Sequence, residues 1–164
     1  MEASQLKAIL EDHSFTAHFP QSVLEALAEV ASVQEVTAGE IVFRDGGPND
    51  QLYLVQQGRL ALEINIPGQR PVRILTLAPG EMAGWSALLG EGKMTAGATA
   101  IVDSVLIVAP AAALRDLCEV NHDFGYHLMR QMAVALSQRL VVTRLQLLDL
   151  FGNSPAPLSI EEKP

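Results

Sequence analysis

The sequence is poor in cysteine and in basic residues. Cys118 is its single cysteine, so no disulfide can form within the chain, and this fits the reducing cytoplasm that we expect as its location. The 11 Lys and Arg are outnumbered by 19 Asp and Glu, which gives a net charge of −8, and no basic run occurs. Nucleic-acid binders need a basic face to neutralise phosphates. We therefore expect no direct contact with DNA or RNA.

Long apolar runs are also missing. The best candidate, AIVDSVLIVAPAAAL at 100–114, is interrupted by Asp103, Ser104 and Pro110, and it is too short to span a bilayer. The first residues, MEASQLKAILEDHS, carry acids and lack a basic segment followed by an apolar core. We expect neither a secretory signal nor a membrane partner.

The residues that most enzymes need are absent as well. No histidine occurs in residues 33–109, and the four histidines lie outside it, at His13, His18, His122 and His127. A metal-dependent cupin, which is also a jelly roll, needs several histidine and carboxylate ligands on its strands. No P-loop lysine motif, nucleophile elbow or Cys–His pairing is visible either. We predict a protein that is not an enzyme and binds no metal.

The pattern of apolar residues predicts one domain over residues 1–150. Apolar residues at helical spacing predict helices within 4–31, and short β-rich runs between glycine turns fill 33–109. Helical patterns return over 110–150, and the polar, Pro-rich 151–164 is expected to be a flexible tail. The predicted fold is mainly β with flanking helices, a double-stranded β-helix (jelly-roll) with a long C-terminal helix.

That long helix carries two apolar stripes. Asn121 is its predicted N-cap, and the helix is expected to run to about residue 150. A heptad stripe runs through Met129, Ala133, Leu136, Leu140, Thr143, Leu147 and Leu150. A second stripe contains Phe124, Leu128, Ala135, Val142 and Leu145. Two stripes indicate packing on the roll and on a second copy of the chain, hence a homodimer; a helix enclosed within one monomer is the alternative.

One Gly-rich stretch could carry chemistry. GEMAGWSALLGEGKMTAGATA, at 80–100, is interpreted as a glycine turn, a short helix, a loop and a strand. Free N–H groups at a helix start attract anions, and a glycine lets a ligand approach the backbone. Any tight turn uses glycines, however, so the spacing also fits a turn that binds nothing.

This stretch, together with AGEIVFRDGGPNDQLYLVQQGRLAL at 38–62, resembles the cyclic nucleotide-binding domain. That domain is the regulatory β-roll of the catabolite activator protein, of cyclic-nucleotide-dependent kinases and of gated channels. The resemblance covers residues 8–150. It implies that 80–100 is the family's phosphate-binding cassette. Because the sequence stops soon after the long helix, it is most similar to stand-alone bacterial members without a DNA-binding domain.

The resemblance also implies site residues. In members that bind cAMP, a Gly-Glu pair holds the ribose and an Arg-Ser/Thr-Ala triplet holds the phosphate. Gly84 matches the glycine, and Thr95 and Ala96 match the end of the triplet. Trp85 stands where the glutamate is expected, and Met94 stands where the arginine is expected.

Three more positions complete the predicted set. Ser86 and Ala87 belong to the short helix whose N–H groups complete the cradle, and Thr143 matches the threonine that reaches the base at the dimer seam. Losing the arginine removes a charge-assisted pair worth roughly 1.5–3 kcal/mol, or about one to two orders of magnitude in affinity. Arg59 or Arg73 could replace that charge if either faces inward.

Two functions remain open. The first is a dimeric sensor whose cyclic nucleotide binding is weak or is replaced by another small ligand, with no other cofactor. The second is a ligand-free module that binds a protein partner or acts as a scaffold, with the Trp85 ring filling the cassette pocket.

Overall fold

The computed structural model describes residues 2–152, so nearly all of the predicted tail lies outside the described residues. The helices are α1 (Ala3–Asp12), α2 (Gln21–Val30), α3 (Trp85–Leu89), α4 (Ala111–Val120) and α5 (His122–Gly152). The strands are β1 (Ser32–Val36), β2 (Ile41–Phe43), β3 (Gln51–Gln57), β4 (Leu60–Ile64), β5 (Val72–Leu77), β6 (Met82–Ala83), β7 (Gly97–Ala100) and β8 (Ser104–Pro110). The elements follow the predicted order of helices, short strands and helices.

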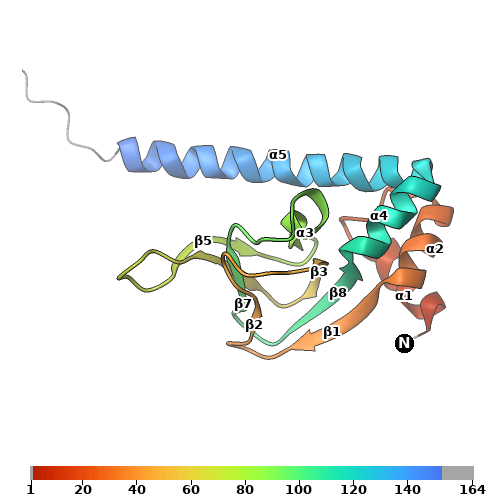
Figure 1. Ribbon diagram of the computed structural model, residues 1–164, viewed down its shortest axis with the longest axis horizontal. Helices are drawn as coiled ribbons and strands as arrows, with labels where there is room; N and C mark the ends of the chain where they lie inside the picture. The colour runs from red at the N-terminus through yellow and green to blue at the C-terminus, as the bar shows by residue number, and fades with distance from the viewer. Residues whose placement is uncertain (1, 153–164) are drawn as a thin grey trace, which may run out of the picture.

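Two four-stranded antiparallel sheets form the roll, in the orders β1-β8-β3-β6 and β2-β7-β4-β5. Strands distant in sequence are neighbours in both sheets, as in the pairs β1·β8 and β4·β7, which is the connectivity of a double-stranded β-helix. Helices α1, α2 and α4 gather at one end, and α5 runs along one side (Figure 1). The predicted fold class is confirmed.

The core is apolar and continuous. Val55, Leu60, Leu77, Met82 and Leu106 are almost fully buried between the sheets, where every residue removed from water contributes about 1.5–3 kcal/mol. Both residues of β6 are buried in this core, which anchors this part of the cassette.

The turn between α1 and α2 is fixed to the roll by His13. Nε2 of the buried imidazole lies 3.0 Å from the Val55 carbonyl oxygen, and Nδ1 accepts the N–H of Phe15 at 3.2 Å. Since Nδ1 accepts, Nε2 carries the proton and the ring is neutral. Desolvation by burial lowers the pKa of His13 from its ordinary value near 6.5, and the hydrogen bond to Val55 opposes this shift. The Val55 carbonyl oxygen also accepts the N–H of Gly80, at the start of the cassette.

Helix α5 begins as predicted and continues two residues past the predicted end. The Asn121 side chain accepts the N–H of Phe124 at 3.1 Å, which is the expected N-cap. Phe124, Leu128 and Met132 are buried, but every described side chain beyond Arg139 is exposed. The second predicted stripe therefore packs on the domain only in its first half.

The second half of α5 leaves many apolar side chains in water. Leu140, Val141, Val142, Leu145, Leu147 and Leu148 are 42–63% exposed. Val142 and Leu145 were expected to pack on the roll, but they are 42% and 56% exposed. Over the residues that the structure describes, no helix is both long and apolar enough to cross a membrane.

Candidate functional site

The Gly-rich stretch folds into strand, turn, short helix, loop and strand, as predicted. Gly84 ends β6 in the left-handed conformation with φ of 79° and caps α3. A Cβ at this position would lie 2.5 Å from the Gln51 carbonyl oxygen and 3.1 Å from the Tyr53 ring, so only glycine fits. The loop after α3 returns through a bridge between Lys93 and Pro48 before β7 begins.

Six of the eight predicted site residues line one small cavity, which we call the cassette cavity. Gly84, Trp85, Ser86, Met94, Thr95 and Ala96 border it, together with Phe43, Leu62, Ala83 and Arg139. Its volume is about 30 Å³, whereas pockets for small-molecule ligands usually measure about 300–1,000 Å³. The Met94 side chain is only 3% exposed, and Trp85 packs against the core. In this conformation the apolar side chains leave little free volume in the cassette cavity.

The other two predicted residues lie elsewhere. Ala87 is buried and faces a larger cavity behind α3. Thr143 is exposed on α5, does not line the cassette cavity, and donates its hydroxyl to the Arg139 carbonyl oxygen at 2.9 Å. Any contact of Thr143 with a ligand would therefore need a change in the cavity or the approach of a second chain.

An aromatic and amide network holds the wall next to Met94. The Phe43 and Tyr53 rings stack with centroids 5.6 Å apart, and the Tyr53 hydroxyl donates to Asn49 Oδ1 at 3.0 Å. Asn49 Nδ2 donates to the Gln51 carbonyl oxygen at 2.7 Å and lies 3.6 Å from Met94 Sδ. Burial, followed by the nearby charge of Asp50, raises the pKa of Tyr53. This wall is neutral and offers no positive charge to a phosphate.

The replacement charges considered from sequence do not reach the cavity. Arg59 and Arg73 are exposed and line no part of it, and Arg59 lies in the turn before β4, outside the strand. Lys93 is exposed while Met94 points inward, as strand alternation predicts. The hypothesis that Arg59 or Arg73 faces the cavity is therefore wrong.

Arg139, on α5, supplies the charge that sequence reasoning missed. Its Nη2 atom donates to the Met82 carbonyl oxygen at 2.7 Å, and the side chain borders the cassette cavity. Burial lowers the pKa of the Arg139 guanidinium, and the charge of Glu81 opposes this shift, but a guanidinium keeps its proton in proteins. A signal was present in the sequence: Arg139 interrupts the apolar stripe between Ala135 and Val142.

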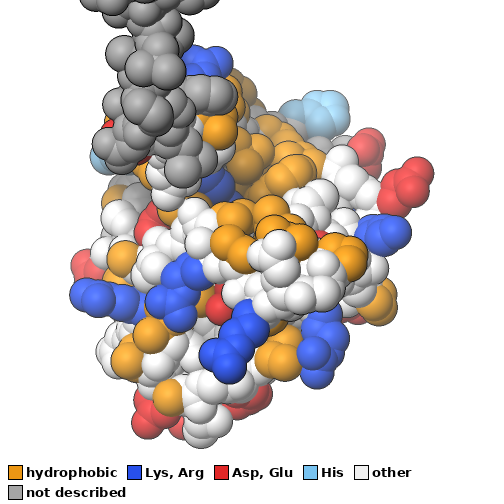
Figure 2. Space-filling model, turned by 90° about the vertical axis from the view of Figure 1, so that its left-hand side faces the viewer, with side chains coloured by type: hydrophobic (Ala, Val, Ile, Leu, Met, Phe, Trp, Pro, Cys, Tyr) orange, Lys and Arg blue, Asp and Glu red, His pale blue; other side chains and the backbone are white. Residues whose placement is uncertain are grey.

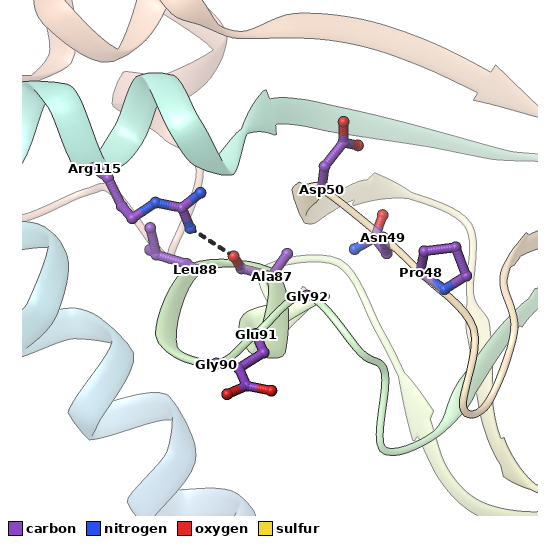
Figure 3. Close-up of a pocket in the computed structure, with 9 residues that line it drawn as sticks. All are labelled: Pro48, Asn49, Asp50, Ala87, Leu88, Gly90, Glu91, Gly92 and Arg115. Atoms are coloured by element: carbon purple, nitrogen blue, oxygen red, sulfur yellow. Dashed lines mark hydrogen bonds between the residues drawn. The ribbon is translucent and has the colours of Figure 1, made fainter.

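Behind α3 lies a larger cavity, of about 720 Å³. Figure 3 shows the nine residues that line it, from the loop before β3, the end of α3, the loop after α3 and helix α4. Here Arg115 Nη1 donates to the Ala87 carbonyl oxygen at 2.8 Å, which connects α4 to α3. Among the described residues, no group of three or more His, Cys, Asp and Glu side chains is placed to hold a metal ion.

A family model described as "cyclic nucleotide-binding domain" matches residues 33–121 of this chain. A CRP-like cAMP-activated global transcriptional regulator of Mycobacterium tuberculosis is 26% identical over 129 residues, which cover 79% of this chain and 56% of that protein. A cAMP-dependent protein kinase regulatory subunit of Blastocladiella emersonii is 34% identical over 84 residues, covering 51% and 20%. The chain thus spans about half the length of the mycobacterial relative and less of the kinase subunit.

Solved structures share the fold. A putative cyclic nucleotide-binding protein from Geobacter metallireducens superposes with a TM-score of 0.70 at 24% identity, over 85% of this chain and 98% of that one. The catabolite activator protein of Thermus thermophilus gives 0.66 at 27% identity, over 86% and 63%. Each of the two matches covers at least 85% of this chain.

Proposed function

This chain belongs to the cyclic nucleotide-binding domain family, and we propose that it is a dimeric regulatory module whose cassette binds cyclic nucleotides weakly or binds another small ligand. The observation that carries the proposal is the presence of Trp85 and Met94 in the cassette cavity. These two side chains occupy the positions where cAMP-binding members are expected to hold a glutamate and an arginine.

The cavity's charge argues for weak binding of a cyclic phosphate. Among the described residues, Arg139 is the one charged side chain that lines it, and that guanidinium already donates to the Met82 carbonyl oxygen. A phosphate that leaves water without a dedicated charge-assisted pair forgoes roughly 1.5–3 kcal/mol. A nucleotide would also have to displace Trp85 or Met94, because about 30 Å³ is too little space for it.

Two hydrogen bonds provide a route from the cassette to the helices. Arg115 connects α4 to the carbonyl oxygen of Ala87 in α3, and Arg139 connects α5 to Met82 in β6. A ligand that moves Trp85 also moves α3, and through these bonds it favours a different position of α4 and α5. We therefore expect ligand binding to change the positions of α4 and α5.

The exposed half of α5 supports a homodimer. Leu140 and Leu147, on the predicted heptad stripe, are 51% and 49% exposed in the single chain. A stripe of this kind is stable in water when a second helix covers it, and a second copy of the chain offers the same stripe. The alternative of a helix enclosed within one monomer finds no support in these exposures.

Titration calorimetry with cAMP and with cGMP, up to millimolar ligand, tests the proposal. We expect heats that saturate only near the millimolar range, with a matching rise in melting temperature. A Kd below about 1 μM for either nucleotide would contradict a degenerate cassette. If neither nucleotide gives a binding heat, the result would favour another ligand or the second candidate function. That second function is a ligand-free interaction or scaffold module in which Trp85 permanently fills the cavity.

A further inference from the structure

A separate cavity of about 410 Å³ lies beside α5, and we call it the α5 cavity. Its walls come from α5, from β5, from the turn after α1 and from the first residues of the cassette. The volume falls within the range of small-ligand sites, about 300–1,000 Å³. It is more than ten times the volume of the cassette cavity.

The lining combines apolar and polar side chains with two opposite charges, those of Arg139 and Glu81. Phe15 and Met82 are buried, and Leu75 and Val142 extend the apolar surface. Arg139 borders this cavity as well as the cassette cavity. Within the described residues its side chain makes one hydrogen bond, to the Met82 carbonyl oxygen, although a guanidinium has five N–H donors.

The α5 cavity opens on a helix face that the proposed dimer does not use. Its α5 residues, Gln131, Ala135, Gln138 and Val142, follow one another at spacings of four, three and four. At 100° per residue these positions lie on nearly the opposite side of the helix from Leu136, Leu140 and Leu147. A second copy packed on the heptad stripe would leave this cavity accessible.

We propose that the α5 cavity binds a small amphipathic carboxylate. The carboxylate pairs with the free edge of the Arg139 guanidinium, whose planar donors match a carboxylate in a bidentate pair. The hydrocarbon part lies against Phe15, Met82 and Val142, where it is removed from water. The α5 cavity is separate from the cassette cavity, so the inference goes beyond the proposed function.

Glu81 places a negative charge at the rim of the α5 cavity. It is exposed and also lines the cavity, and its Oε2 accepts the N–H of Ala78 at 2.7 Å. Its negative charge opposes an incoming anion, although solvent screens the effect. Glu81→Gln keeps an acceptor for Ala78, so we expect it to strengthen carboxylate binding a few-fold.

Octanoate is a suitable probe of the full chain, with n-octylammonium as the control of equal length and opposite charge. We expect calorimetry to detect octanoate and not n-octylammonium. Gln138→Trp places a large ring over the cavity from an exposed position, and it is expected to weaken octanoate binding at least ten-fold. Ser137→Trp, exposed on the same turn but outside the cavity, is the matched control and should change affinity less than two-fold.

Three outcomes would overturn the proposal. They are no octanoate binding at 10 mM, equal binding of n-octylammonium, and equal effects of the two tryptophan variants. Circular dichroism of Gln138→Trp checks that lost binding does not come from lost structure. Because the readout is octanoate, a failure of cAMP binding leaves this test unaffected, and the two proposals can fail separately.

Discussion

The Nη2 atom of Arg139 lies 2.7 Å from the carbonyl oxygen of Met82, so the middle of α5 is joined to β6, within the cassette. This contact also marks a boundary on α5. Phe124 and Leu128 before it are buried, whereas Leu140 and every later described side chain are exposed. The stability of the α5–roll interface and the behaviour of the cassette therefore depend on the same guanidinium.

Arg139→Met should destabilise the domain. The methionine fills similar space, but it leaves the Met82 carbonyl oxygen without its partner. We expect a loss of about 1–3 kcal/mol in the free energy of unfolding, measured by urea denaturation. Arg144→Met removes an exposed arginine from the same helix and should stay within about 0.5 kcal/mol of the wild type. Equal effects of the two substitutions would contradict the role given to the Met82 contact.

Gly84→Ala tests the turn before α3. Both Gly84 and Gly39 have positive φ, 79° and 85°, but a Cβ at Gly39 meets nothing within 4 Å. Gly39→Ala therefore measures backbone strain alone, about 1–2 kcal/mol. Gly84→Ala adds the contact with the Gln51 carbonyl oxygen and should cost at least 1 kcal/mol more. Equal losses in chemical denaturation would mean that the cassette turn relaxes freely.

His13 should make stability depend on pH. Burial lowers its pKa in the folded state, so the unfolded chain binds a proton at higher pH than the folded one does. The free energy of unfolding should thus be highest above the unfolded pKa of about 6.5 and should fall as the pH drops below it.

His13→Gln gives the comparison that isolates this residue. The three other histidines are common to both proteins, so the difference between wild type and variant reports His13 alone. Urea denaturation from pH 7.5 to pH 5.5 should show a steeper loss for the wild type. Parallel curves for the two proteins would show that His13 does not titrate across this range.

Leu140→Glu together with Leu147→Glu should produce a monomer. Both side chains lie on the heptad stripe and are about half exposed, so charges there would repel across a helix pair without disturbing the roll. Sedimentation should show a dimer for the wild type and a monomer for the double variant. Val120→Glu, on α4 at 82% exposure, is the control and should remain dimeric. A wild-type monomer at high concentration would contradict the proposed dimer.

The sequence was sufficient to predict the elements because their signals are local. Glycine turns, alternating strands and the Asn121 cap each depend on residues close together in the chain. The strand pairing and the position of Arg139 depend on contacts between distant segments. Arg139 is 57 residues from Met82 in sequence, and no local pattern connects them.

Two misjudged features have the same cause. Arg59 and Arg73 were considered as replacement charges because both belong to the β-rich region, but side-chain direction there depends on turns and pairing. The second apolar stripe was expected to pack on the roll, whereas Val142 and Leu145 in its second half are 42% and 56% exposed, because burial there depends on contacts with distant segments. Figure 2 shows apolar side chains exposed on the face of the molecule that lies on the left in Figure 1.

The central claim is that Trp85 and Met94 prevent the cassette from binding a cyclic nucleotide tightly. Calorimetry with cAMP on the double variant Trp85→Glu, Met94→Arg tests it most directly. The substitutions remove the two apolar side chains that border the cassette cavity and add a carboxylate for ribose and a guanidinium for phosphate. We predict that cAMP binds the variant at least ten-fold more tightly than the wild type. Unchanged affinity in a folded variant would contradict the account.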